Sequence, residues 1–290
     1  MSEARTVRAP YYSKDQLEYL ADQHTEAFSR YDGKEDPGFS AWKFAAYYLG
    51  KAVRFEWLSS NGFILGLSSF TAGTRVAIYL PEENNFEWQE LGPDTILLNK
   101  LFEDAFLNPG RARFTLMHEC AHHLLHTPYF QKIEAAGQKT TVAYSIQYDR
   151  DHAMLEGMNA WTDNDRMEWQ ANYLASALLM PEKRVSLVLE KKGYKDTYFE
   201  QVMAGYAETT AYNQLINRLA GAFRVSTAVA KIRLEKRGFE RLPDLHKPKP
   251  NPWSDWIPPP QKPARMSKEE RRLERIERAL ERRRNKEMDL

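Results

Sequence analysis

The spacing of apolar residues predicts helices first and strands next. Apolar residues recur at helical spacing between residues 14 and 29, and a second helix is expected near residues 41–49. The period then changes to two, because Val53, Phe55 and Trp57 alternate with charged residues. That alternation is typical of a half-buried strand.

Three more strands are expected, at residues 63–67, 76–80 and 95–98. Asn61-Gly62 is a turn signal typical of β-hairpins. After residue 100 the pattern is mostly helical. A small sheet followed by helices predicts an α+β fold.

The last part of the chain has a different composition. Eight of the fifteen prolines lie between residues 243 and 263, which predicts an extended linker. Residues 265–290 alternate Arg and Glu, and we interpret them as a solvated helix, with a short coiled coil or a partner-docking helix as the alternative. The expected organisation is a domain at 1–185, a helical subdomain at 186–242, a linker at 243–264 and a charged helical tail at 265–290.

Composition narrows the class of protein. Apolar residues make up 42% of the 290 residues, which is too many for a disordered chain. Cys120 is the only cysteine, so no intramolecular disulfide can form. With no signal peptide and no membrane-length apolar run visible, we expect a cytoplasmic protein without a membrane partner. The net charge of +1 combines a net −8 over residues 1–212 with a net +9 over residues 213–290.

The segment that carries chemistry contains the pattern H-E-x-x-H. On a helix, His118 and His122 lie one turn apart on the same face, so both imidazoles can bind one metal ion. Glu119 follows the first histidine, where its carboxylate can act on a metal-bound water. Four of the seven histidines fall within nine residues, which argues against a chance occurrence.

A catalytic zinc site needs a third protein ligand. The extended motif with a third histidine is excluded, because Leu125 and Pro128 stand where it requires Gly and His. The remaining option is Glu168, on a second helix that opens with a capping-box pattern at Thr162. Asn172 lies one turn further on, where it can hydrogen-bond a ligand histidine.

At these residues the sequence resembles the ImmA/IrrE family of bacterial zinc metallopeptidases. Residues 113–122, preceded by a strand at 96–99, match the family's metal-binding helix. Residues 168–181 read E-W-Q-A-N-Y-L-A-S-A-L-L-M-P, close to the family's E-x-x-A-N-x-F-A-x-x-L-L-M-P. Residues 219–234 are close to L-A-x-x-F-x-V-S-x-x-A-V-x-x-R-L, and residues 127–160 look like an insertion beside the site.

The resemblance implies a zincin-like fold in domain 1–185, with His118, His122 and Glu168 as zinc ligands and Glu119 as the catalytic carboxylate. It implies a zinc-dependent endopeptidase that cleaves a helix-turn-helix repressor or related regulator in stress response or mobile-element induction. Mn²⁺ or another divalent ion can also occupy such a site. Two alternatives stay open. One is a non-catalytic DNA-binding or repressor-binding regulator in which the zincin is a sensor domain, and the other is a toxin–antitoxin or phage-defence component.

The sequence also predicts roles for several residues near the H-E-x-x-H motif. We expect Cys120 to be a core residue, His123 not to be a ligand, and His126 to support the ligands or lie on the surface. Thr95–Asn99 is expected to be an edge strand that can pair with an extended substrate. The group that stabilises the oxyanion is one of four candidates: Tyr144, Tyr148, His152 and Tyr173.

Residues 213–242 are expected to form a helix, a short turn and a second helix capped by Ser226. This segment holds seven basic and two acidic residues, so DNA contact is one interpretation. We favour a helical subdomain packed on the peptidase, because no base-reading pattern is identifiable. Its expected core residues are Leu215, Leu219, Phe223, Val229, Ile232 and Leu234.

Overall fold

The computed structural model describes residues 7–103, 109–137, 143–146 and 162–243. The chain divides into two units, residues 1–246 and 247–290, and everything described below lies in the first. The linker and tail expected at 243–264 and 265–290 lie outside the described residues apart from Pro243. Among the described residues, no helix is long and apolar enough to cross a membrane.

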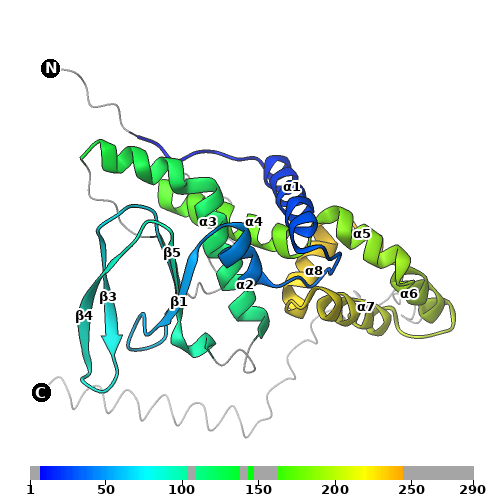
Figure 1. The fold of residues 1–290 in the computed structure, drawn as a ribbon. Coiled ribbons are helices and arrows are strands. Elements are labelled where there is room, and N and C mark those ends of the chain that lie inside the picture. The colour runs from blue at the N-terminus through cyan, green and yellow to red at the C-terminus, as the bar shows by residue number, and fades with distance from the viewer. Residues whose placement is uncertain (1–6, 104–108, 138–142, 147–161, 244–290) are drawn as a thin grey trace, which may run out of the picture. The chain divides into compact units, whose positions relative to one another are not determined.

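Among the described elements, strands β1 to β5 follow one another along the chain, and helices predominate after them (Figure 1). This order confirms the α+β class, because a parallel α/β fold would alternate strands with helices. The strands are β1 (Ala52–Glu56), β2 (Ile64–Ser69), β3 (Thr74–Leu80), β4 (Asn85–Leu91), β5 (Thr95–Asn99) and β6 (Ala143–Ile146). The helices are α1 (Lys14–Asp32), α2 (Ala41–Lys43) continued by a π-helical turn (Phe44–Tyr48), a 3₁₀ turn (Lys100–Phe102), α3 (Pro109–Ala135), α4 (Asp163–Leu179), α5 (Glu182–Lys191), α6 (Tyr194–Met203), α7 (Glu208–Phe223) and α8 (Thr227–Lys236).

Local signals account for the ends of several helices. Ser13 caps α1 in a capping box with Gln16, and Gly33 ends that helix in the left-handed conformation. The predicted capping box at Thr162 begins α4, and Ser226 caps α8 as predicted. Helix α3 continues through Pro128, so the segment that looks like an insertion begins inside this helix.

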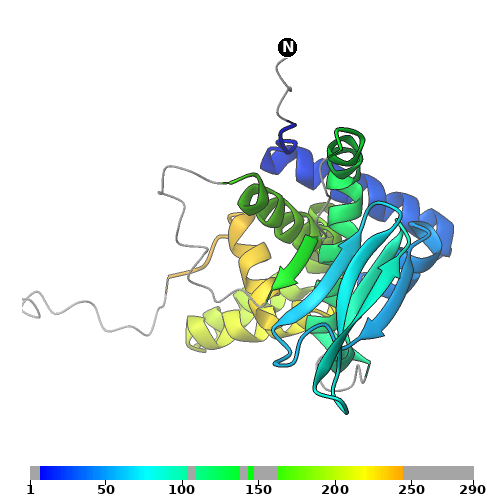
Figure 2. The same ribbon diagram turned by 90° about the vertical axis from the view of Figure 1, so that its left-hand side faces the viewer.

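Four strands form one sheet in the order β1-β5-β2-β6, and β3 pairs only with β4 among the described residues (Figure 2). The expected edge strand at 95–99 is therefore wrong, because β5 lies between β1 and β2. Its continuous apolar run is typical of a strand buried on both faces. Asn61-Gly62 does not close a hairpin either, because β5 separates β1 from β2.

The sheet separates a layer of helices from the β3–β4 hairpin. On β5, Ile96 and Leu98 pack into the helical core, whereas Leu97 packs with Val76 and Ile78 of the hairpin. Strand β4 was not predicted, because its alternating aromatic residues point to solvent rather than to the core.

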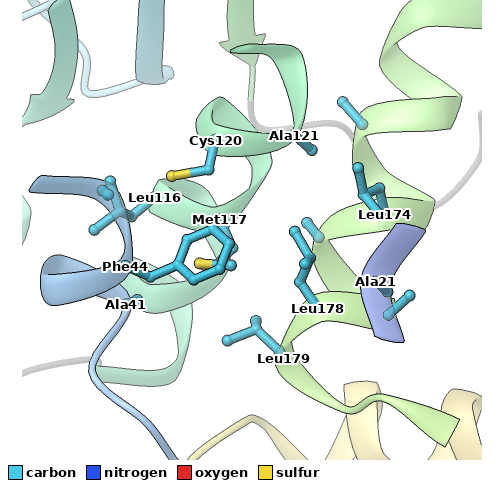
Figure 3. Close-up of a cluster of buried hydrophobic side chains, with 14 of the residues drawn as sticks. Ala21, Ala41, Phe44, Leu116, Met117, Cys120, Ala121, Leu174, Leu178 and Leu179 are labelled. Carbon is cyan, nitrogen blue, oxygen red and sulfur yellow. The ribbon is translucent and has the colours of Figure 1, made fainter. Parts of the chain in front are cut away.

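Helices α3 and α4 pack side by side, and both contribute to the main core (Figure 3). Ala171 and Ala175 of α4 are fully buried in this core, where their small side chains permit close helix packing. Cys120 is a buried free thiol in this core, as predicted. A second core lies among helices α5 to α8.

Candidate metal centre

The two histidines of H-E-x-x-H and Glu168 meet between α3 and α4. The Nε2 atoms of His118 and His122 lie 3.0 Å apart. The Glu168 carboxylate places Oε2 3.2 Å from His118 Nε2 and Oε1 3.3 Å from His122 Nε2. All three side chains are buried, and their ligand atoms lie within 4.8 Å of one another. The structure thus brings together the three residues that the sequence nominated as ligands.

The Nδ1 atoms of His118 and His122 are also hydrogen-bonded, and their partners determine which nitrogen of each ring carries the proton. Asn172 Oδ1 lies 3.0 Å from His118 Nδ1, as predicted, and His126 Nδ1 lies 3.0 Å from His122 Nδ1. Asn172 Oδ1 can only accept, so His118 carries its proton on Nδ1. When Nδ1 of His122 is also the donor, both Nε2 atoms present lone pairs toward the carboxylate.

Three lone-pair donors that face one another across about 3 Å repel unless a positive charge lies between them. Part of that charge can be a proton. Burial opposes protonation of His118, but Glu168 outweighs it and raises the pKa of this histidine. Burial likewise opposes ionisation of Glu168, but the two histidines outweigh it and lower its pKa. Two histidines that present nitrogen lone pairs, together with an ionised glutamate, fit a divalent metal ion.

Glu119 lies beside the cluster in a different environment. Its side chain is fully buried, and its Oε2 accepts a hydrogen bond of 2.7 Å from Ser68 Oγ on β2. Its Oε1 has no hydrogen-bond partner among the described residues. Burial is the main cause that raises the pKa of Glu119, to about 8. A buried carboxyl with one free oxygen and a raised pKa is suited to taking up a proton.

Strand β2 is irregular at Gly66, the residue that lies against Glu119. The pairing of β2 with β6 shifts between Ile64 and Gly66, which is a β-bulge. A Cβ atom on Gly66 would lie 2.5 Å from Glu119 Oε1, so a larger residue there must displace this carboxylate. Sequence reasoning missed both Gly66 and Ser68, because no local pattern connects β2 with a helix fifty residues away.

The two remaining histidines of the helix differ from each other. His126 is fully buried, and its Nε2 lies 3.1 Å from Gln170 Oε1, so it supports a ligand, one of the two roles expected for it. His123 packs on Phe70, with ring centroids 4.9 Å apart, and takes no part in the cluster. Burial, the largest cause in both cases, lowers the pKa of each to about 3.

The structure narrows the candidates for an oxyanion-stabilising group. Tyr173 donates a 2.9 Å hydrogen bond to Glu18 on α1, away from the histidines, and burial followed by Glu18 raises its pKa to about 12. Tyr148, His152 and the side chain of Tyr144 lie outside the described residues.

The comparison with protein families gives one match. Residues 150–235 match the Peptidase M78 family, described as an IrrE N-terminal-like domain. The match supports membership of the ImmA/IrrE family. That is a metallopeptidase-type family, and the matched segment contains Glu168, Asn172 and helices α4 to α7 with most of α8. The H-E-x-x-H helix precedes the match, and no curated protein matches the chain.

The helices expected to resemble a helix-turn-helix are present as α7 and α8. Leu215, Leu219, Phe223 and Leu234 are buried in the second core, as expected. Ile232 is 51% exposed, so its assignment to the core is wrong. The reason is that Arg233, not Ile232, points inward, where it meets Glu18.

All seven basic residues of this segment contact groups of the same chain. Three bind groups outside α7 and α8: Arg224 to Asp36, Arg233 to Glu18, and Arg237 to the carbonyl of Glu182. Arg241 binds Glu208 at the start of α7. Of the other three, Arg218 lies over Tyr194 on α6, Lys231 lies near Glu235 on the same helix, and Lys236 lies over Tyr173 on α4. These contacts compete with binding to phosphate.

Proposed function

We propose that this protein is a metal-dependent endopeptidase, with His118, His122 and Glu168 as metal ligands and Glu119 as general base. One observation carries the proposal: three buried lone-pair donors converge on one point, beside a buried carboxyl oxygen that lacks a partner within the described residues. The metal is zinc, with Mn²⁺ as the next candidate, because two histidines and a glutamate accept both.

The residues of the centre would have separate roles in peptide hydrolysis. A divalent ion held by the three ligands would polarise a peptide carbonyl and acidify a water molecule. Ser68 fixes one oxygen of Glu119, which leaves Oε1 to take a proton from water and later deliver it to the leaving amine. Asn172 and His126 hold the ligand rings in position.

We propose a regulatory protein of the helix-turn-helix class, either a repressor or an antitoxin, as the substrate, in stress response or mobile-element induction. The family resemblance supports this class. The charge of the chain supports it too, because residues 1–212 carry a net −8 and DNA-binding proteins are basic. The alternative of a DNA-binding regulator is weaker, because the basic side chains of α7 and α8 already have partners.

The test is a cleavage assay with the purified full chain and the helix-turn-helix protein encoded nearest to its gene. We expect cleavage that a chelator abolishes and that Zn²⁺ or Mn²⁺ restores. Glu119→Gln should lower the rate by about 10²–10⁴-fold while metal binding persists, because only proton transfer is lost.

Cys120→Ala is the matched control, since it changes the next residue of the same helix on its core-facing side. It should cleave like the wild type. If Glu119→Gln cleaves as fast as the wild type, or if the regulatory output persists without cleavage, the catalytic proposal fails and the sensor alternative replaces it.

A further inference from the structure

A chain of hydrogen bonds runs from the metal cluster to the N-terminal segment. His122 Nδ1 lies 3.0 Å from His126 Nδ1, and His126 Nε2 lies 3.1 Å from Gln170 Oε1. Gln170 Nε2 donates to the carbonyl oxygen of Pro10 at 3.0 Å. His122, His126 and Gln170 are fully buried, so water does not substitute for these contacts.

The donor and acceptor chemistry of these groups fixes which atom donates in each hydrogen bond of the series. The carbonyl of Pro10 can only accept, so Gln170 donates to it through its amide nitrogen and turns its oxygen toward His126. His126 must then carry its proton on Nε2, which leaves Nδ1 as an acceptor. His122 therefore donates from Nδ1 and presents the lone pair of Nε2 to the cluster. In this arrangement each of the three hydrogen bonds joins one donor to one acceptor.

The segment at the end of the chain of hydrogen bonds is held against α4. The backbone N–H of Ala9 donates to Asp163 Oδ2 at 3.0 Å, at the start of that helix. Ala9 is buried in a small cluster with Phe70, Phe130 and Met167. Pro10 is thus fixed in place from both sides, by the contact of Ala9 and by the cap of α1 at Ser13.

We infer that His126 and Gln170 are positioning residues for the metal ligand His122, and that the Pro10 carbonyl anchors them, so that residues 7–13 contribute to metal affinity from outside the centre. This inference rests on the proposed function only in requiring that the centre binds a divalent metal ion. Hydrogen bonds to ligand histidines fix the tautomer and ring orientation, and losing them lowers metal affinity by about 10–100-fold.

The first experiment measures Zn²⁺ affinity by competition with a chromophoric chelator, on the full chain and its variants. His126→Leu should bind Zn²⁺ about 10–100-fold more weakly, because His122 loses its acceptor. His126→Gln should restore most of the affinity, because an amide can accept from His122 and donate to Gln170. In the zinc-bound wild type, ¹⁵N NMR of the histidine rings should show the proton of His122 on Nδ1.

His123→Leu is the matched control. His123 is the neighbouring buried histidine of the same helix, but it packs on Phe70 outside the chain of hydrogen bonds. We expect its Zn²⁺ affinity to equal that of the wild type. If His126→Leu keeps full affinity, or if both leucine variants lose it equally, the positioning role is overturned. If the wild type itself binds neither Zn²⁺ nor Mn²⁺, the proposed function is overturned together with this inference.

A double-mutant cycle tests the anchor. Gln170→Leu should weaken Zn²⁺ binding by about tenfold, and deletion of residues 1–10 should weaken it less. Combined, the two changes should give no more loss than Gln170→Leu alone, because the segment acts through Gln170. If the deletion has no effect, or if its effect adds fully to that of Gln170→Leu, the anchoring role of Pro10 is overturned.

Discussion

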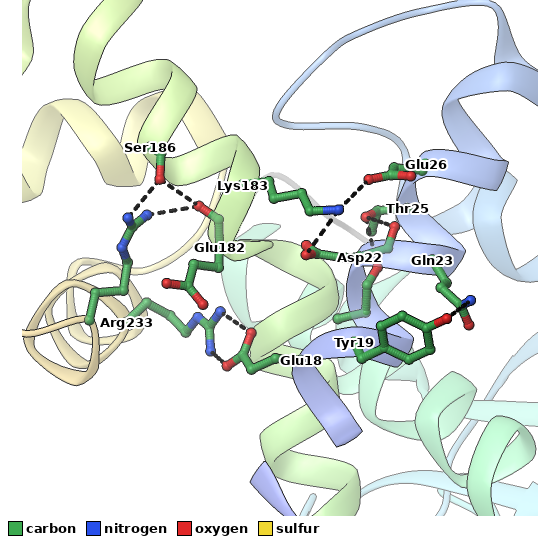
Figure 4. Close-up of polar contacts among 12 residues, drawn as sticks. Glu18, Tyr19, Asp22, Gln23, Thr25, Glu26, Glu182, Lys183, Ser186 and Arg233 are labelled. Atoms are coloured by element: carbon green, nitrogen blue, oxygen red, sulfur yellow. Dashed lines mark hydrogen bonds and ion pairs between the residues drawn. The ribbon is translucent and has the colours of Figure 1, made fainter. Parts of the chain in front are cut away.

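Two buried ionic clusters lie on different sides of α4, and they differ in how completely their polar atoms are paired. In the first, Arg233 donates to both oxygens of Glu18 (Figure 4). Arg233 also donates to the carbonyl of Met180, and Tyr173 donates to Glu18. In the second, lone pairs face one another, and Glu119 Oε1 lacks a partner among the described residues. A cluster with all its partners stabilises the fold, whereas an incomplete cluster is poised to take up a metal ion and a proton.

The same substitution, a glutamate to a glutamine, can be made in both clusters. Glu18→Gln should lower the free energy of unfolding by about 3 kcal/mol, because it leaves the Arg233 guanidinium buried without its countercharge. This is the low end for a broken buried pair, since 20% of the Glu18 side chain is exposed. Urea denaturation measures the loss, and Zn²⁺ affinity should stay unchanged.

Glu119→Gln is the matched variant for this measurement. We expect its free energy of unfolding to stay within about 1 kcal/mol of the wild type, because an amide can still accept from Ser68. If both variants lose the same free energy of unfolding, the two clusters do not differ in the way we describe.

A smaller effect should follow from filling the space beside Glu119. The Cβ atom of Gly66→Ala would meet Glu119 Oε1 at 2.5 Å and must displace the carboxylate. A displacement of about 1 Å can cost about 100-fold in rate, so cleavage should fall by up to that factor. Zn²⁺ affinity should change little, because the three ligands are not touched.

Gly221→Ala provides the control, because a Cβ there meets no atom within 4 Å among the described residues. It should leave the rate of cleavage unchanged. Equal rates for Gly66→Ala and the wild type would show that Glu119 does not need its observed position.

The smallest effect concerns pH. Burial alone would raise the pKa of Glu18, but the hydrogen bonds and charge of Arg233 outweigh it, and the pKa is lowered from its ordinary value of 4.5. A lowered pKa stabilises the fold above that value, and the stabilisation is lost as the pH falls below it. The difference in stability between the wild type and Glu18→Gln should therefore shrink below about pH 4.5. Urea denaturation between pH 3 and pH 7 measures it, and a difference that stays constant contradicts the role of this ion pair.

The sequence predicted the local features of the centre and missed the long-range ones. His118 and His122 lie one helical turn apart, and so do Glu168 and Asn172. These residues were found because spacing along a helix places both members of a pair on the same face. Gly66 and Ser68 were missed because they reach Glu119 through strand-to-helix packing, which leaves no mark in either segment. The inward turn of Arg233 was missed for the same reason, because its partner Glu18 is 215 positions away.

Long-range contacts also explain why the position of strand β5 in the sheet was predicted wrongly. The strand at 95–99 was identified from its apolar residues, but its place between β1 and β2 depends on a parallel pairing across forty residues. β-strand order is a property of the whole chain, whereas strand identity is a property of a few residues.

The pairing of Glu18 with Arg233 has a consequence for how the protein is made. Glu18 lies on α1 and Arg233 on α8, so the carboxylate is synthesised 215 residues before its cation. The two histidines and Glu168 are all synthesised before Arg233. A chain that stops short of α8 can carry all three ligands, yet it lacks the contact that joins its first helix to its last described one. The contact between Glu18 and Arg233 can thus form only after the three candidate ligands have been translated.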